Sequence, residues 1–423
     1  MNPNCTSNTA WRAWTQHRVA LFCLVLVVAG CKTTSNLETD SAGLKQIDSA
    51  ALQTVVDATT RELLVPGAVV LLRTPQGEFV AASGTTQLGT HDKPGTDTYF
   101  RIASVTKTMT AAIVLQLAQE GKLSLDDPIS RYVEGVPNGN AITIAQLLEM
   151  RSGLYGYTDA PEVAAAIDRD PMKTWTPAEL LAIAFSHPPV FAPGTQYEYS
   201  NTNYALLGLV IENVDGKSLG EAMQQRLFVP LGMRHTMLPA STSNSIPTPY
   251  SHGYLYGSSS IALYGEPPYT AKERADAESG ALKPTDYTGL NHSFAAAAGG
   301  VISTAEDLAI WMAALAEGRV LNAQYQRSWR DSLQVEDPAR PWQKYGYGIS
   351  ELRWGPNAVY FHGGETPGYN VKISYDPASR TTLVVWTNLT VSIDEQQTAN
   401  VLWIRVLDQI YEVSPLTLTS AAR

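Results

Sequence analysis

FRIASVTKTMT, at residues Phe100–Thr110, joins a β-prone run to a long apolar segment with helical spacing. We therefore expect Ser104 in the first turn of a helix, with Lys107 one turn later on the same face. A serine hydroxyl becomes a strong nucleophile when a base takes its proton. An amine held one turn away can be that base if its pKa is lowered. For S-x-x-K alone, the alternative is a capping serine followed by a solvated lysine.

Two further short groups carry chemically useful side chains. Tyr199-Ser200-Asn201 is predicted in a loop before a helix, and His362-Gly363-Gly364 at the end of a strand. A phenol can relay a proton, and an asparagine can hold a lysine or a substrate amide. Glycines at a strand edge let a substrate backbone approach. Taken singly, each group also has an ordinary explanation: a partly buried tyrosine, a helix-capping asparagine and a turn.

Together the three groups resemble the motifs of the serine β-lactamase and penicillin-binding protein superfamily. That superfamily has S-x-x-K, then Y-x-N, then K/H-x-G, in this order. The resemblance is to the branch of class C β-lactamases, D-alanyl-D-alanine carboxypeptidases, D-aminopeptidases and related esterases, and it covers about 45–412. The flanking segments that share it are 142–148, 152–154, 191–195, 230–233 and 299–304.

The resemblance implies a serine hydrolase that works without a metal or other cofactor. It makes Ser104 the acylated nucleophile, Lys107 its base and Tyr199 the proton relay. Water would then hydrolyse the acyl-enzyme. The seven histidines show no H-E-x-x-H pair. The one G-x-S-x-G match, Gly216-Lys217-Ser218-Leu219-Gly220, follows a predicted helix and not the strand that a nucleophile elbow requires, so two rival hydrolase classes are disfavoured.

The resemblance also implies how substrate is bound. Asn201 would orient Lys107 and the substrate. His362 would fill the third-motif position, followed by Gly363 and Gly364. The N–H groups of Ser104 and Glu365 would form the oxyanion hole. Class C β-lactamases usually have lysine where this chain has His362. A histidine is only partly charged near neutrality, so we expect a weak site for a substrate carboxylate and slow acylation by penicillins.

The order of the predicted elements indicates an α+β fold. We expect one antiparallel sheet built from both ends of the chain, flanked by N- and C-terminal helices, plus an all-helical lobe. The predicted strands are 68–73, 78–83, 347–353, 358–362, 371–375 and 381–387. The main predicted helices are 47–64, 104–120, 142–150, 203–214, 219–229 and 394–413. Residues 161–186 are predicted to form more than one helix, with a capped start at Thr176-Pro177-Ala178-Glu179. A short helix is expected from Leu125, and a capping box at Ser303–Glu306 that starts a helix.

One long segment, residues 241–291, has weak periodicity and is rich in Ser, Pro, Gly and Tyr. We expect loops and short strands there. The segment contains Tyr250, Tyr254, Tyr256, Tyr264 and Tyr269. These tyrosines either line the cleft or pack the loop, and the sequence favours neither alternative.

Composition places the chain among globular proteins. It has 423 residues, 44% hydrophobic and 17% charged, with a net charge of −10 and no basic run, so we expect no nucleic-acid partner. The three cysteines, Cys5, Cys23 and Cys31, all lie at the N-terminus. This excludes cysteine catalysis and cysteine metal sites in the domain that follows.

The first thirty residues read as an export signal. Arg12 and Arg18 precede an apolar run, Val19–Val28, and Val28-Ala29-Gly30-Cys31 resembles the lipobox of bacterial lipoproteins. We expect a lipoprotein signal peptide at 1–30, lipidation of Cys31, a flexible tether at 31–44, the hydrolase domain at 45–415 and a tail at 416–423. The alternatives are an ordinary secretory signal and a free N-terminal cysteine.

These features together predict a monomeric, lipid-anchored serine hydrolase of the bacterial cell envelope, with the outer membrane or periplasm favoured by resemblance. The substrates expected are small amides or esters: D-amino-acid peptides, some of them derived from peptidoglycan, esters or β-lactams. The sequence does not choose among them. The rival function is a non-catalytic penicillin-binding-like sensor or binding lipoprotein.

Overall fold

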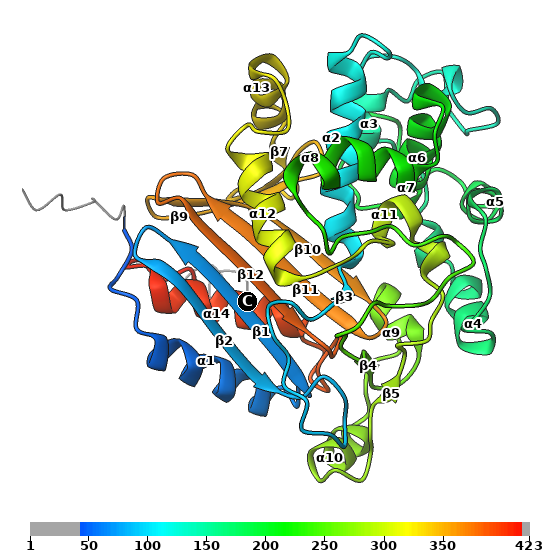
Figure 1. Cartoon of the computed structure of the whole chain (residues 1–423). Helices are drawn as coiled ribbons and strands as arrows, with labels where there is room; N and C mark the ends of the chain where they lie inside the picture. The colour runs from blue at the N-terminus through cyan, green and yellow to red at the C-terminus, as the bar shows by residue number, and fades with distance from the viewer. Residues whose placement is uncertain (1–42, 417–423) are drawn as a thin grey trace, which may run out of the picture. The chain divides into compact units, whose positions relative to one another are not determined.

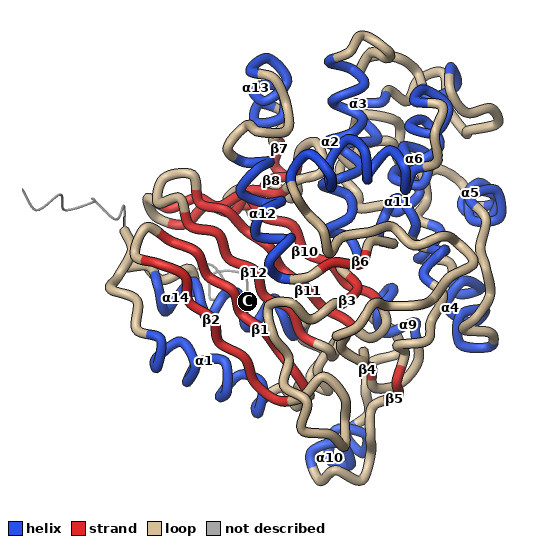
Figure 2. Tube along the Cα trace, viewed as in Figure 1, coloured by secondary structure: helices blue, strands red, loops and turns tan. Residues whose placement is uncertain are grey.

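The computed structural model describes residues 43–416, so the signal peptide, Cys31 and the tether up to residue 42 lie outside the described residues, as does the tail from residue 417. Within the described part, the main sheet has eight strands in the order β2-β1-β12-β11-β10-β9-β8-β7, all neighbours antiparallel. Figure 2 shows these strands in red, lying side by side. The predicted α+β fold, with a sheet built from both ends of the chain, is confirmed.

The N-terminal hairpin enters the sheet through β1 (Gly67–Thr74), which pairs on one side with β2 (Gly77–Gly84) and on the other with β12 (Thr381–Thr387). Residues from Gly67 to Leu72 of β1 are buried. Side chains alternate between the faces of a strand. Val69 and Leu71 therefore join the core on one face, and Val70 and Leu72 the core on the other.

Helices cover both faces of the sheet (Figure 1). The terminal helices α1 (Ser49–Glu62) and α14 (Thr398–Ile410) pack against each other and against one face. On the other face, α12 (Ala305–Ala316) contacts β1, β11 and β12. The helical lobe adjoins this second face and is built from α2 (Thr106–Gln119), α3 (Ile144–Leu148), α4 (Pro161–Arg169), α5 (Pro177–Ser186), α6 (Asn201–Asp215), α7 (Leu219–Met223), α8 (Val229–Leu231) and α11 (Ala296–Gly299).

The C-terminal half supplies the remaining strands of the sheet. The strands are β7 (Gln334–Val335), β8 (Gln343–Tyr345), β9 (Ser350–Trp354), β10 (Asn357–Thr366) and β11 (Tyr369–Asp376). A short helix, α13 (Ala323–Asp331), precedes β7. None of α13, β7 and β8 was predicted, and the two strands have only two and three residues.

Two predicted helix starts are wrong. The short helix expected from Leu125 is a single 3-10 turn, Ile129–Arg131. The cap of α12 lies one residue later than predicted: Thr304 Oγ1 accepts a hydrogen bond from the N–H of Asp307 at 3.3 Å, because Ser303 belongs to β6 (Ile302–Ser303).

The segment 241–291 was expected to hold only loops and short strands, but it forms two helices as well. They are α9 (Ser259–Tyr264) and α10 (Ala271–Glu278), between the short strands β4 (Tyr254–Leu255) and β5 (Thr285–Asp286). Thr270 and Glu273 form a capping box at the start of α10. Three of its tyrosines are buried: Tyr254, Tyr256 and Tyr269. For these three, the alternative that the tyrosines pack the loop is the one that the structure supports.

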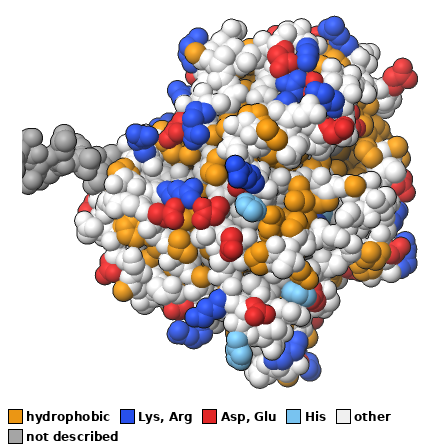
Figure 3. All heavy atoms as spheres, in the orientation of Figure 1, with side chains coloured by type: hydrophobic (Ala, Val, Ile, Leu, Met, Phe, Trp, Pro, Cys, Tyr) orange, Lys and Arg blue, Asp and Glu red, His pale blue; other side chains and the backbone are white. Residues whose placement is uncertain are grey.

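The molecular surface mixes both signs of charge on the face drawn in Figure 3, where basic and acidic side chains alternate rather than form separate fields. Among residues 43–416, no helix combines the length and the apolar character needed to cross a bilayer.

Candidate active site

Ser104 lies in a 3-10 turn, Ala103–Val105, that leads directly into α2. The residue before it, Ala103, has a φ of 44°, which is unusual for a residue with a Cβ atom. Strained backbone of this kind persists only where the surrounding structure holds it. Here strand β10 holds it, because a Cβ added to Gly364 would lie 2.3 Å from the carbonyl oxygen of Ile102.

Lys107 lies at the start of α2, one turn after Ser104, and is fully buried, so it is not a solvated lysine. Its Nζ lies 2.9 Å from Ser104 Oγ, 2.6 Å from Asn201 Oδ1 and 2.8 Å from the carbonyl oxygen of Ala298. Burial holds the pKa of Lys107 well below its usual value.

These three contacts fit a neutral amine at Lys107. The oxygens of Asn201 and Ala298 can only accept hydrogen bonds, so they take the two N–H donors of a neutral amine. The lone pair of Nζ is then directed at Ser104 Oγ, where it can accept the hydroxyl proton. The arrangement therefore gives Ser104 a base.

Tyr199 and Asn201 stand at the start of α6, on the opposite wall from Ser104. The ring centroid of Tyr199 is 4.8 Å from Lys107 Nζ. Burial of the hydroxyl raises the pKa of Tyr199, against an opposing hydrogen bond with Ser104, so the phenol stays protonated at neutral pH. Asn201 does not cap α6: its Nδ2 donates to Thr158 Oγ1 at 2.9 Å, and its Oδ1 holds Lys107.

His362 is buried inside β10, with Nδ1 2.6 Å from the carbonyl oxygen of Gly363 and Nε2 3.2 Å from Tyr345 Oη. Since the carbonyl only accepts, Nδ1 carries the proton and Nε2 accepts from the tyrosine hydroxyl. Burial lowers the pKa of His362 to about 3. The third motif is therefore uncharged at neutral pH.

The sequence predicted His362-Gly363-Gly364 at the end of a strand, and this prediction is wrong. The group lies in the interior of β10, which continues to Thr366. Strand β9 accompanies β10 only as far as Phe361, which pairs with Ser350. Beyond that point the edge of β10 is open towards Ser104 among the described residues. In an antiparallel hairpin, pairs that exchange hydrogen bonds alternate with pairs that do not. Thr366 and Tyr369 close the two-residue turn as a hydrogen-bonded pair, so the next pair, Glu365 and Asn370, is not hydrogen-bonded. The N–H of Glu365 therefore points away from β11, to the open edge of β10.

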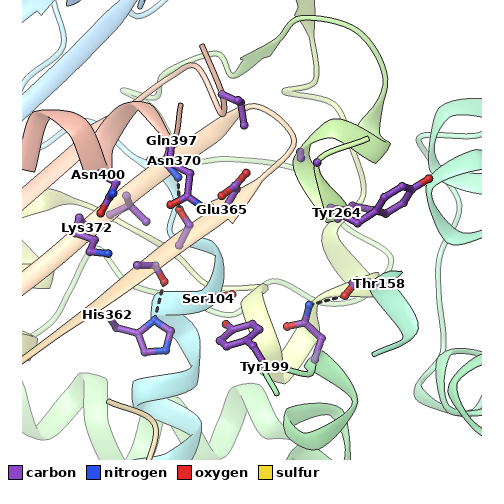
Figure 4. Close-up of a pocket in the computed structure, with 18 of the residues that line it drawn as sticks. Ser104, Thr158, Tyr199, Tyr264, His362, Glu365, Asn370, Lys372, Gln397 and Asn400 are labelled. Carbon is purple, nitrogen blue, oxygen red and sulfur yellow. Dashed lines mark hydrogen bonds between the residues drawn. The ribbon is translucent and has the colours of Figure 1, made fainter. Parts of the chain in front are cut away.

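A cavity of about 530 Å³ lies along this edge and brings the predicted residues together. Figure 4 shows Tyr199 and His362 pointing into it, with Ser104 behind them. Of the tyrosines in 241–291, Tyr264 lines the cavity from α9. The lining also includes these predicted site residues: Ser104, Tyr199, Asn201, His362, Gly363, Gly364 and Glu365.

The sequence did not single out several side chains of the site. Thr158 holds Asn201, Tyr345 contacts His362, and Lys372 lines the cavity from β11. The turn Pro367-Gly368 could have indicated Lys372, because a two-residue turn sets the register that places Lys372 opposite Gly363. No comparable pattern marked Tyr345, since β8 is too short.

Comparison with known proteins identifies the relatives of this fold and site. A family model described as Beta-lactamase matches residues 52–407. A D-stereospecific amidohydrolase from Streptomyces superposes with a TM-score of 0.71 at 32% identity, over 83% of this chain and 97% of that one. D-amino acid amidase from Ochrobactrum anthropi SV3 superposes with a TM-score of 0.71 at 27% identity, over 85% of this chain and 97% of the amidase.

Protein flp of Staphylococcus aureus is 31% identical over 191 residues, which is 44% of this chain and 37% of flp. The match thus spans less than half the length of this curated relative. The family model, by contrast, covers most of the chain, and both solved structures share nearly all of their length with it. The chain therefore belongs to the beta-lactamase family, within the superfamily of beta-lactamase/transpeptidase-like serine hydrolases.

Proposed function

We propose that the protein hydrolyses amides of D-amino acids, and related esters, through an acyl-enzyme on Ser104. The observation that carries this proposal is the buried amine of Lys107. Two carbonyl oxygens, of Asn201 and Ala298, hold its Nζ, and the third contact of Nζ is with Ser104 Oγ. Such a base lets the serine attack without a metal or a histidine.

In the reaction we propose, Lys107 takes the Ser104 proton as Oγ attacks the substrate carbonyl. The oxyanion is held by the N–H groups of Ser104 and Glu365. The proton passes through Tyr199 to the leaving nitrogen, and the C–N bond breaks. Water then attacks the ester, gives its proton back along the same route, and releases the acid from Ser104.

Two observations favour D-amino-acid amides over β-lactams as substrates. The solved neighbours at 32% and 27% identity are a D-stereospecific amidohydrolase and a D-amino acid amidase. In addition, His362 is neutral, so the third motif provides no fixed positive charge for the carboxylate of a β-lactam. We expect nitrocefin to acylate the enzyme slowly, if at all.

A substrate panel tests the proposal: D- and L-phenylalaninamide, p-nitrophenyl acetate and nitrocefin, each with the wild type and Ser104→Ala. We expect turnover of the D-amide in excess of the L-amide, abolished by Ser104→Ala. Ser186→Ala is a matched control, since Ser186 is exposed on α5 and outside the cavity.

Labelling by a fluorophosphonate or a fluorescent penicillin gives an independent answer. Labelling that Ser104→Ala abolishes and Ser186→Ala preserves supports an acyl-enzyme. No labelling and no turnover of any ester or D-amide would instead favour a non-catalytic binding protein. Nitrocefin turnover faster than D-amide turnover would overturn the choice of substrate.

A further inference from the structure

A second cavity, of about 670 Å³, lies in the helical lobe and shares no lining residue with the cavity at Ser104. Its walls come from α5, α6, α7 and α11 (Figure 1) and from parts of the segments 238–243 and 292–295. This volume is within the range of small-molecule sites. The proposed reaction uses none of the residues that line it, so the second cavity is separate from the candidate active site.

The interior of the second cavity is apolar, and its rim is polar. The buried side chains that line it include Trp175, Leu180 and Phe294. The exposed side chains that line it include Gln224 and Ser241. Burial of apolar ligand surface against such an interior is favourable. A ligand that binds here would therefore place an apolar part inside the lobe and remain accessible to solvent at the rim.

Within the described chain, Arg101 is the one cation that lines the second cavity. It lies on β3 (Phe100–Arg101), three residues before Ser104, and only 1% of its surface is exposed. Burial lowers the pKa of Arg101 to about 10, so the guanidinium remains charged at neutral pH. Among residues 43–416, no carboxylate forms an ion pair with it. The protein therefore supplies this buried cation with no counter-ion.

The guanidinium of Arg101 also lacks hydrogen-bond acceptors. Its Nη2 donates to the carbonyl oxygen of Asn244 at 2.9 Å and to that of Leu290 at 3.3 Å, which ties the segment 241–291 to β3. Its Nε is buried without a partner, and its Nη1 donates to no described residue. Unpaired buried charges and unsatisfied buried donors both cost free energy. An anion in the cavity would relieve both costs.

The other titratable side chains of the lining leave this positive charge available. Burial holds the pKa of His292 well below its usual value, so its ring is uncharged. The two acidic residues of the lining accept hydrogen bonds near the start of α7: Glu212 from the N–H of Leu219 at 2.9 Å, and Glu221 from the N–H of Ser218 at 3.0 Å. A single available positive charge matches a carboxylate better than a phosphate, whose charge approaches −2.

We propose that the second cavity binds a small amphipathic carboxylate, with its anionic group on Arg101 and its apolar part among the buried side chains of the lobe. A ligand in this position leaves Ser104 accessible. It would lie close to the catalytic base, because Ala296 and Ala297 of α11 line the cavity and the carbonyl oxygen of Ala298 holds Lys107 Nζ. Binding at Arg101 is independent of the proposed hydrolysis.

Calorimetry with decanoate, decanamide and decyl phosphate tests the charge of the ligand. Decanoate and decanamide share an apolar chain and differ in the anionic group. We expect the wild type to bind decanoate about ten- to a hundredfold more tightly than decanamide, as for hydrogen bonds to a charged group. Arg101→Met, with folding checked by its melting curve, should remove this preference, and Arg101→Lys should keep part of it. Equal binding of decanoate and decanamide to the wild type, or tighter binding of decyl phosphate, would overturn the carboxylate site.

A second pair of variants locates the ligand without changing Arg101, whose bonds to the segment 241–291 also support folding. Leu209 is a half-buried lining residue on α6, so Leu209→Trp should abolish decanoate binding by filling the space for the alkyl chain. Val229→Trp, at an exposed position of α8 outside the cavity, is the matched control and should bind decanoate as the wild type does.

Ser104→Ala separates this site from the proposed function, because none of these measurements uses turnover. We expect Ser104→Ala to bind decanoate with wild-type affinity, whether or not the wild type hydrolyses any amide. Decanoate binding that survives in Leu209→Trp, or that is lost in Ser104→Ala, would place the ligand outside the second cavity and overturn the proposal.

Discussion

At the scale of single residues, the protonation state of Lys107 sets the pH dependence of acylation. The amine must be neutral to accept the Ser104 proton, and burial lowers its pKa. We therefore expect the rate of fluorophosphonate labelling to rise with pH as Lys107 loses its proton, and to level off well below pH 10.5. A rate that keeps rising to pH 10.5 would mean that Lys107 is a solvated amine.

Removing the base should cost much more than removing an ordinary lysine. Lys107→Met should lower the acylation rate about 10²- to 10⁴-fold, the usual contribution of a general base. Labelling rates at constant pH measure this loss. Lys344 on β8 is near Glu351 and outside the cavity at Ser104, so Lys344→Met should label at the wild-type rate. Similar rates for both variants would remove Lys107 from the mechanism.

His362 contributes to stability in a pH range that follows from its environment. Its pKa is about 3 in the folded protein and about 6.5 in the unfolded chain. Between these values the unfolded chain binds a proton that the folded protein does not, so the free energy of unfolding falls as pH falls from 6.5 towards 3. Denaturant midpoints for wild type and His362→Asn between pH 7 and 4 measure this. Parallel curves would contradict a neutral His362.

The residues found from sequence and those missed differ in what determines their position. Ser104 and Lys107 meet because residues three apart on a helix share a face, which spacing reveals. Tyr345 and Lys372 reach the site through strand pairing, which depends on residues distant in sequence. The neutral state of His362 depends on burial, which a motif does not contain.

At the scale of elements, the contact between β10 and the turn of Ser104 allows a sharp comparison of two glycines. An added Cβ at Gly364 would meet the Ile102 carbonyl oxygen at 2.3 Å, whereas one at Gly363 meets Lys372 Cδ at 3.4 Å. We expect Gly364→Ala to lower the melting temperature, at a cost of about 1–3 kcal/mol, and to slow labelling of Ser104. Gly363→Ala should fold normally. Equal melting temperatures for the two variants would contradict this packing.

The ends of elements were predicted where local chemistry decides them. The capping box of Thr176 and Glu179 starts α5 where the sequence indicates. Strand β10 was predicted to end at His362 because glycines are poor strand formers. It continues to Thr366 because β11 pairs with it and because the turn of Ser104 requires a surface without side chains.

At the scale of the whole molecule, β1 links the two cores of the sheet. Leu71 belongs to one core and Leu72 to the other. Leu71→Ala and Leu72→Ala should each lower the free energy of unfolding by about 2–5 kcal/mol in denaturant titrations. Val80→Ala on the neighbouring β2 is the control, since Val80 is 49% exposed and should change it by less than about 0.5 kcal/mol. A change at only one of the two leucines would mean that the cores unfold separately.

Attachment to the envelope remains a proposal that rests on the N-terminal sequence. We propose that Cys31 carries a lipid, as the apolar run and the small residues before it indicate. Cys31→Ser should abolish incorporation of a labelled fatty acid and release the protein from the membrane fraction. Cys23→Ser, inside the apolar run, should do neither, and lipid incorporation in Cys31→Ser would contradict the assignment.

The general architecture could be predicted because hydrophobic periodicity changes from helical to alternating along the chain, and the strands fall at both ends. The helices α9 and α10 were not predicted, because six and eight residues show little periodicity. The capping box of Thr270 and Glu273 is the sequence signal that could have indicated α10.

The pairing of β1 with β12 also has a consequence for biosynthesis. The N–H of Gly67 donates to Asn388 Oδ1 across 321 residues, so the centre of the sheet joins the two ends of the chain. At about 5–20 residues per second, a ribosome needs roughly 15–60 s to supply the second partner after the first. The N-terminal hairpin must wait that long with an unpaired edge. Folding of this domain is therefore a late event, completed only when the last strand has left the ribosome or, for an exported chain, the membrane.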